Sequence, residues 1–148
     1  MDIQKADLLR GLRRDCINDI MDIAIQESYG EGACLFLRGD PAGYFYFLLM
    51  GQVKLHLGET GKVIHHVSRP GEIIGWSGLV GREAYTASAE CTTSTELHRI
   101  AAGKLRKILE NNPVDGFVFF ENLAKILGDR LFQSYSRYEK VFVTSTLI

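Results

Sequence analysis

The feature that most constrains the fold is a series of short β-rich segments, between Glu27 and about Ala101, that are separated by glycine and other turn residues. These segments are ACLFLR, YFYFLLM, QVKLHLG, KVIHHVS, EIIG, YTASAEC and TELHRIA. Branched and aromatic side chains favour extended strands, and the intervening GDPAG, GETG and RPG sequences are typical of turns. About seven or eight strands at this close spacing predict a sandwich or barrel of the jelly-roll type.

Helical patterns flank this region on both sides. Apolar residues recur three or four positions apart between Asp7 and Ile25, which predicts an amphipathic helix or two short ones. A short helix is expected over GKLRKILENNP, and a long one from Val114 towards Phe142. The sequence therefore predicts a mainly β fold with added helices: an N-terminal helix, a jelly-roll barrel and two C-terminal helices, of which the last is long.

The chain is expected to form one domain. Its 148 residues are enough for one sizeable core and too few for two full domains. We assign residues 1–25 to the N-terminal helical segment, 27–101 to the barrel and 102–142 to the closing helices, and we expect no DNA-binding domain within them.

The charge and hydropathy of the chain exclude several classes of partner. Seventeen basic residues stand against eighteen acidic ones, so no overall positive charge attracts nucleic acid or anionic lipid. No apolar run approaches the roughly 18 residues of a membrane span. We therefore expect a cytoplasmic protein that contacts neither nucleic acid nor membrane directly.

The cysteines and histidines do not form a metal-binding or catalytic pattern. Cys16, Cys34 and Cys91 are widely spaced and form no CxxC pair, which argues against a disulfide framework or a zinc site. His65 and His66 are adjacent, so on a strand they point to opposite faces. The sequence predicts no enzyme and no metal, and a cupin-like metal-dependent enzyme is the least favoured alternative.

The stretch PGEIIGWSGLVGREAYTAS, residues 70–88, is the best candidate for a ligand site. EIIG ends as a strand, and GWSGLVG has room for a single helical turn, whose first N–H groups lack internal partners. Gly75 and Gly78 remove Cβ atoms that would keep a phosphate from the backbone, and Ser77 adds a hydroxyl donor. A glycine-rich corner between barrel strands is the alternative interpretation.

The order of the whole chain resembles the cyclic-nucleotide-binding domain of the catabolite-activator and fumarate–nitrate regulator superfamily. The resemblance is carried by the Gly-Asp turn at Gly39 and Asp40, the Gly51 step, the PGEIIG entry and the two closing helices. It implies that residues 75–87 form the phosphate-binding cassette. In that family a glutamate of the cassette takes the ribose hydroxyl and an arginine grips the phosphate.

Two positions of the implied cassette depart from the family pattern. The glutamate position falls on Trp76 and the arginine position on Tyr85, whereas Gly75, Thr86 and Ala87 keep the pattern. Each hydrogen bond to a charged group contributes about 1.5–3 kcal/mol, so losing both lowers affinity by ~10²–10⁴. The resemblance therefore implies weakened or altered binding of cyclic AMP.

Positive charge is available nearby, because Arg82 precedes Tyr85 by three residues. An exposed loop arginine with no ligand is the alternative interpretation of Arg82. The candidate ligand-binding residues are Gly75, Trp76, Ser77, Gly78, Arg82, Tyr85 and Thr86. The implied ligand is a cyclic nucleotide or another phosphate-bearing effector.

The long helix has apolar residues on more than one side. One seam recurs in steps of three and four, through Phe117, Phe120, Ala124, Leu127, Leu131, Ser134, Tyr138 and Val141. Four further residues lie outside the seam: Val118, Leu123, Ile126 and Tyr135. One stripe docks a helix on its own barrel, and a second requires another surface. We expect a two-fold homodimer through Val114–Phe142, with packing of both sides within one chain as the alternative.

The expected function is that of a non-enzymatic sensor or regulatory module. A nucleotide or other small anionic effector would bind in the barrel, and the long helix would relay its presence to a partner. A ligand-free structural dimerisation domain is the main alternative.

Overall fold

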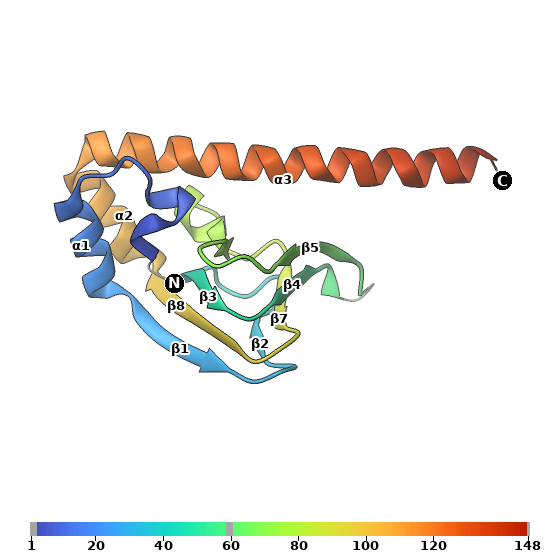
Figure 1. Ribbon diagram of the computed structural model, residues 1–148, viewed down its shortest axis with the longest axis horizontal. Coiled ribbons are helices and arrows are strands. Elements are labelled where there is room, and N and C mark those ends of the chain that lie inside the picture. Colours follow the sequence, from blue (N-terminus) through green and yellow to red (C-terminus); the bar gives the residue numbers. More distant parts are fainter. Residues whose placement is uncertain (1–2, 59–60, 148) are drawn as a thin grey trace.

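The computed structural model describes residues 3–58 and 61–147, with side chains described up to residue 139. Its described strands form two four-stranded antiparallel sheets that face one another (Figure 1). The first sheet has the order β1 (Ile25–Tyr29), β8 (Thr95–Ala101), β3 (Tyr44–Met50) and β6 (Ile73–Ile74). The second has the order β2 (Cys34–Phe36), β7 (Ser88–Cys91), β4 (Val53–His56) and β5 (Val63–Val67). The predicted jelly-roll fold with helices is confirmed.

Helices close the barrel at one end and along one side (Figure 1). They are η1 (Ile3–Lys5), η2 (Asp7–Leu9), α1 (Arg14–Ile23), α2 (Ala102–Asn111) and α3 (Pro113–Leu147). The N-terminal pattern forms separate short helices because Gly11 adopts a left-handed φ of 87° between η2 and α1. The expectation of a helix up to Ile25 was wrong at its end, since β1 begins there and pairs with β8.

The GETG turn joins β4 to β5 as a hairpin, as the sequence predicts. Gly58 and Gly61 have left-handed φ values of 65° and 64°, a conformation that residues other than glycine rarely adopt. Glu59 and Thr60 lie outside the described residues.

Strand β3 separates two apolar clusters, because successive side chains of a strand point to opposite faces. Phe45 and Phe47 belong to the cluster beneath the helices, where their rings meet edge to face at 5.0 Å. Tyr46 belongs to the cluster between the two sheets. Tyr44 is 40% exposed and lies under the guanidinium of Arg99. The YFYF sequence thus serves both clusters, and one tyrosine remains at the surface.

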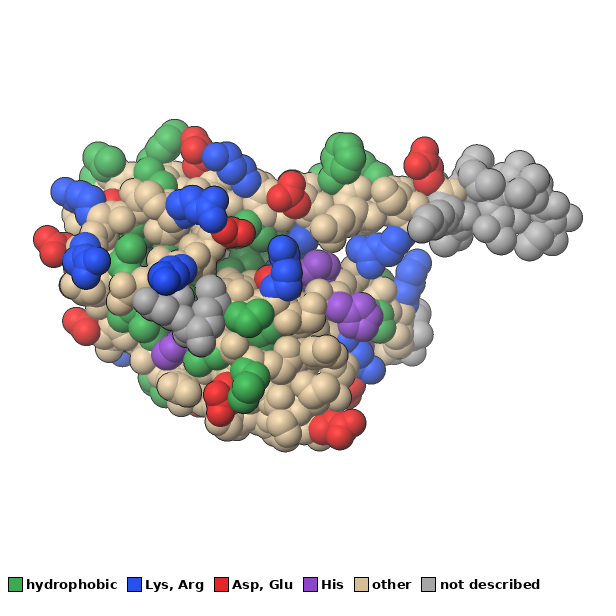
Figure 2. All heavy atoms as spheres, in the orientation of Figure 1, with side chains coloured by type: hydrophobic (Ala, Val, Ile, Leu, Met, Phe, Trp, Pro, Cys, Tyr) green, Lys and Arg blue, Asp and Glu red, His purple; other side chains and the backbone are tan. Residues whose placement is uncertain are grey.

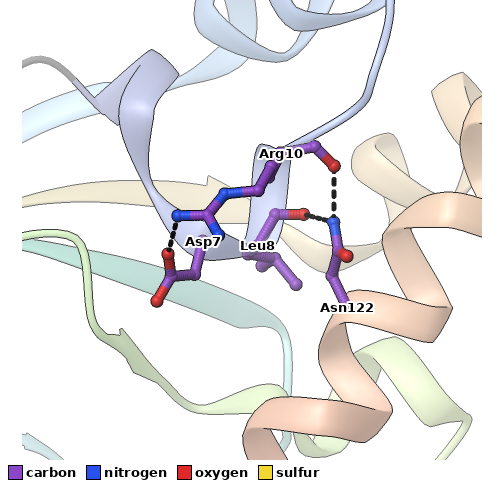
Figure 3. Close-up of polar contacts among 4 residues, drawn as sticks. All are labelled: Asp7, Leu8, Arg10 and Asn122. Carbon is purple, nitrogen blue, oxygen red and sulfur yellow. Dashed lines mark hydrogen bonds and ion pairs between the residues drawn. The ribbon is translucent and has the colours of Figure 1, made fainter.

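The first turns of α3 are fixed to the rest of the domain. Asp115, which is 2% exposed, accepts hydrogen bonds from the backbone N–H of Arg13 at 3.0 Å and from its guanidinium at 3.1 Å. These hydrogen bonds lower the pKa of Asp115. The side-chain amide of Asn122 donates to the carbonyls of Leu8 at 3.0 Å and Arg10 at 2.8 Å (Figure 3). These contacts hold α3 against the segment that precedes α1.

The described part of α3 buries one side and exposes another. Phe119 and Leu123 are buried, and Val118 and Ile126 pack against the same cluster. Figure 2 shows apolar side chains projecting from the outer side of this helix. Six large apolar residues of α3 are exposed: Val114, Phe117, Leu131, Phe132, Tyr135 and Tyr138. The predicted seam is therefore divided: Phe117, Leu131 and Tyr138 are exposed, Phe120 and Leu127 pack against the cluster beneath the helices, and Val141 lies outside the residues whose side chains are described. Phe119, which the sequence did not single out, is fully buried.

None of the described helices combines the length and the apolar character that crossing a membrane requires.

Candidate functional site

The glycine-rich stretch forms the single helical turn that the sequence predicts. Strand β6 ends at Ile74, Gly75 follows with a left-handed φ of 80°, and the short 3-10 helix η4 spans Trp76–Val80. A Cβ on Gly75 would lie 3.1 Å from the carbonyl oxygen of Tyr44 and 3.3 Å from the ring of Phe36. Both its conformation and its surroundings therefore favour glycine at this position.

Gly78 has a packing role that the sequence did not indicate. A Cβ at this position would collide with the carbonyl oxygen of Ala42 and approach the Cβ of Ala102 to 3.2 Å. The close approach of the chain at Ala42 is enough to account for this glycine, without any phosphate.

The start of the η4 turn retains unpaired amides. Among the described residues, no backbone oxygen outside the turn accepts a hydrogen bond from the N–H of Trp76 or Ser77. The carbonyl of Ser77 accepts from the N–H of Arg82 at 3.1 Å. The turn therefore has the donors that an anion site needs, as any helix start does.

An aromatic stack lies next to Gly75, where η4 begins. Tyr85 is 5% exposed, and its ring lies on Phe36 with centroids 3.7 Å apart and planes at 13°. Its hydroxyl donates to the carbonyl of Tyr44 at 2.6 Å and accepts from the Tyr44 N–H at 3.1 Å. Burial raises the pKa of Tyr85, so its hydroxyl is neutral at physiological pH. The ring of Tyr46 is also near Phe36, with the two ring centroids 6.1 Å apart.

The cavity that remains, which we call the barrel pocket, is about 30 Å³. It is lined by Phe36, Leu55, Gly75, Trp76, Ser77, Tyr85, Thr86 and Ala87. One water molecule takes up about 30 Å³ in the liquid, and pockets for drug-sized ligands are roughly 300–1,000 Å³. In this conformation the barrel pocket has room for one water molecule but not for a nucleotide.

The structure brings together five of the seven candidate residues, since Gly75, Trp76, Ser77, Tyr85 and Thr86 all line the barrel pocket. Gly78 and Arg82 do not line it, and the side chain of Arg82 is exposed. Sequence reasoning missed Phe36 and Leu55, the apolar walls of the pocket. Their places in the apolar strand segments ACLFLR and QVKLHLG were the available signal.

Trp76 contributes to the pocket wall, and its side chain also packs against the cluster beneath the helices. The ring that fills the pocket belongs to Tyr85 rather than to Trp76.

The barrel pocket has little positive charge of its own. In the part of the chain that the structure describes, no lysine or arginine side chain lines it. An anion there would meet only the η4 amides and the hydroxyls of Ser77 and Thr86.

The cysteines and acidic residues offer no centre of another kind. Cys16, Cys34 and Cys91 are free thiols, and burial raises the pKa of each. Over the described residues, no group of three His, Cys, Asp or Glu side chains could hold a metal ion.

The comparisons with known proteins agree with this architecture. A family model described as the cyclic nucleotide-binding domain matches residues 26–112, more than half of the chain. The chain belongs to the cyclic nucleotide-binding domain family. The resemblance expected from the glycine turns and the closing helices is thereby confirmed.

Solved structures extend the match to the flanking helices. A protein from Geobacter metallireducens GS-15, described as cyclic nucleotide-binding, is 30% identical, with a TM-score of 0.75 over 84% of this chain and 91% of that one. The N-terminal domain of a transcriptional regulator from Streptomyces coelicolor is 24% identical, with a TM-score of 0.71 over 87% and 94%. The catabolite activator protein of Thermus thermophilus is 22% identical, with a TM-score of 0.72 over 92% of this chain and 63% of that one. No curated protein sequence gives a significant match.

Proposed function

We propose that this family member is a dimeric, non-enzymatic regulatory module whose barrel is closed to cyclic nucleotides by its own aromatic side chains. The observation that carries this proposal is the stack of Tyr85 on Phe36, which leaves about 30 Å³ in the barrel pocket. In this proposal the helix α3, which spans Pro113–Leu147, transmits the state of the module to a partner.

Opening the barrel pocket would be costly. Tyr85 would have to leave the ring of Phe36 and give up its hydrogen bond to Tyr44. Exposing such a ring costs about 2–3 kcal/mol, the aromatic pair about 1 kcal/mol and the hydrogen bond about 1 kcal/mol. The sum, about 4–5 kcal/mol, lowers the affinity of any ligand that needs the open form by ~10³.

Restoring the family residues provides the test. We expect isothermal titration calorimetry to detect no cyclic AMP or cyclic GMP binding to the wild-type chain. The double variant Trp76→Glu/Tyr85→Arg regains the ribose and phosphate partners and removes the blocking ring, so it should bind at least about tenfold more tightly. The matched control is Trp76→Glu/Val80→Arg, which adds the same charges but places the arginine at an exposed position of η4. Micromolar binding by the wild-type chain would contradict the proposal.

The exposed face of α3 supports the dimer. Phe132 is 73% exposed and its ring lies 6.0 Å from that of Tyr135, which is 55% exposed, and such apolar surface is typical of an interface. We expect sedimentation equilibrium to show a dimer at micromolar concentration. Phe132→Asp should shift it towards monomer, and Gln133→Asp, at the next exposed position, should not. A monomeric wild-type chain would overturn the dimer but leave the closed barrel pocket intact.

An effector-binding barrel remains the second candidate, because Trp76 and Ser77 line the barrel pocket and, among the described residues, their amides have no backbone acceptor outside the turn. It requires Tyr85 to move. A cytoplasmic location is part of the proposal, since free thiols such as Cys16 and Cys91 are typical of reducing compartments.

A further inference from the structure

A second and larger hollow lies outside the barrel, beside α3. Its volume is about 200 Å³, and we call it the α3 pocket. The residues that line it are Lys5, Ala6, Asp7, Arg69, Pro70, Gly71, Glu72, Ile73, Ile126 and Arg130. They come from three parts of the fold: the N-terminal segment, the β5–β6 turn and its continuation, and α3. Figure 2 shows basic side chains along the boundary between α3 and the barrel.

The carboxylates of the α3 pocket already have partners. Asp7 pairs with Arg10 at 2.8 Å (Figure 3). Glu72 accepts hydrogen bonds from the backbone N–H groups of Ser68 and Arg69, each at 2.8 Å, and lies 3.5 Å from the guanidinium of Arg69. Asp7 and Glu72 therefore already have hydrogen-bond donors, although the charge of Glu72 still acts on Arg130.

Two cations of the α3 pocket lack such partners. Within residues 3–58 and 61–139, no carboxylate lies within ion-pair distance of Lys5 or Arg130. Arg130 uses one guanidinium nitrogen to donate to the carbonyl of Ile73 at 2.7 Å. An arginine has five N–H donors in a planar fork, so most of those of Arg130 remain available.

The position of Arg130 makes an unpaired charge unfavourable. It is partly buried between α3 and the barrel, and this burial lowers its pKa. A buried cation without a counterion loses hydration that nothing replaces. His65 lies close enough to feel the charge of Arg130, and its pKa, lowered to about 4 by burial, leaves it neutral at physiological pH. The carboxylate of Glu72 acts on Arg130 from beyond ion-pair distance and so offsets its charge in part, and an external anion would offset the remainder.

We propose that the α3 pocket binds a phosphate group, either inorganic phosphate or the phosphate of a small ester, through Lys5, Arg69 and Arg130. Arg130 supplies paired donors for two phosphate oxygens, and the exposed Lys5 supplies charge at the rim, where Arg69 would be shared with Glu72. A volume of about 200 Å³ accommodates a phosphate with only a few further atoms, because drug-sized ligands need roughly 300 Å³ or more.

This inference goes beyond the proposed function, since binding here requires neither an open barrel pocket nor a dimer. It would give the module an effector site that joins Lys5 of η1, Arg69 of the β5–β6 turn and Arg130 of α3. Occupancy would then favour the arrangement in which α3 lies against the N-terminal segment, where Asn122 already holds it.

The test is a titration at constant ionic strength with inorganic phosphate and, separately, glycerol 3-phosphate, with sodium chloride as the ionic control. Calorimetry gives the dissociation constant, and amide chemical shifts give the location. We expect saturable binding that perturbs residues 69–73 and 130. The emission of Trp76, which lines the barrel pocket, should stay unchanged. The probe that binds more tightly identifies the source of the phosphate.

Variants separate this site from general charge effects. Lys5→Glu, at an exposed position, should weaken phosphate binding by about tenfold or more, and Arg130→Gln should do the same. Lys125→Gln removes a charge from the same helix outside the pocket and should change it by less than about twofold. Binding that does not saturate, equal losses in Lys125→Gln, or shifts confined to the barrel pocket would each overturn the proposal. Because Lys5 is exposed, its variant tests the site even if Arg130→Gln fails to fold.

Discussion

The barrel pocket and the α3 pocket differ in what fills them. The barrel pocket is lined by residues of the cassette that the family resemblance implies, but it is about 30 Å³ and includes the stacked ring of Tyr85, whose hydroxyl is hydrogen-bonded within the chain. The α3 pocket is about 200 Å³ and contains the unpaired cations Lys5 and Arg130. Under our proposal, the difference means that the side chains of the barrel pocket have turned a ligand site into core while its backbone is kept. Volume and charge available to a ligand then lie elsewhere on the same scaffold.

Truncating the ring that closes the barrel pocket should have the largest effect on stability. Tyr85→Ala removes a buried ring and leaves a cavity, so we expect a loss of about 3–5 kcal/mol in the free energy of unfolding. Urea denaturation would measure it. Tyr44→Ala, at a 40% exposed neighbouring position, should cost about 1 kcal/mol or less. A cost below about 1 kcal/mol for Tyr85→Ala would mean that the barrel pocket is not core-like.

Lowering the pH should weaken the boundary between the barrel and α3. The pKa of His65 is lowered from 6.5 to about 4, chiefly by burial and also by Arg130 and Arg137. Between these values the unfolded chain binds more protons than the folded one, so stability falls as pH drops from about 6.5 to about 4, by up to about 3 kcal/mol.

Denaturation at several pH values would measure this slope for the wild-type chain and for two variants. His65→Leu should flatten the curve, whereas His66→Leu, at the exposed neighbouring position, should not. Equal slopes for the wild type and His65→Leu would show that His65 does not cause the loss of stability at low pH.

Removing only the hydroxyl of Tyr85 should have the smallest effect. Tyr85→Phe keeps the stack on Phe36 and loses the hydrogen bond to the carbonyl of Tyr44. We expect a loss of about 1 kcal/mol in thermal or urea unfolding. A loss as large as that of Tyr85→Ala would show that the hydrogen bond, rather than the ring, closes the barrel pocket.

Much of this fold could be predicted because its signals are local. The β3 segment YFYFLLM was predicted over its whole length, and the turn glycines marked the ends of most strands. Strand β1 was missed because its residues, IQESY, carry only a weak alternation and continue directly from a helical pattern. The contact of Phe119 with the cluster beneath the helices depends on how α3 rotates against the domain, which spacing alone leaves open.

The sequence indicated five of the residues that line the barrel pocket but not how they pack, and their role as a ligand site stays a prediction. The loss of the family glutamate and arginine at Trp76 and Tyr85 could be read from the sequence. That Tyr85 would lie on Phe36 could not, because the two residues are 49 positions apart and meet only when β2 and the loop after η4 are folded together. The α3 pocket was missed for the same reason, since Lys5, Arg69 and Arg130 are distant in sequence.

The central claim is that Tyr85 and Phe36 keep cyclic nucleotides out of the barrel pocket. Trp76 is the only tryptophan in the chain and lines that pocket, so its fluorescence reports directly on entry of a ligand. We expect that adding cyclic AMP up to ~1 mM leaves the Trp76 emission of the wild-type chain unchanged. A saturable change in that emission with a micromolar midpoint would contradict it.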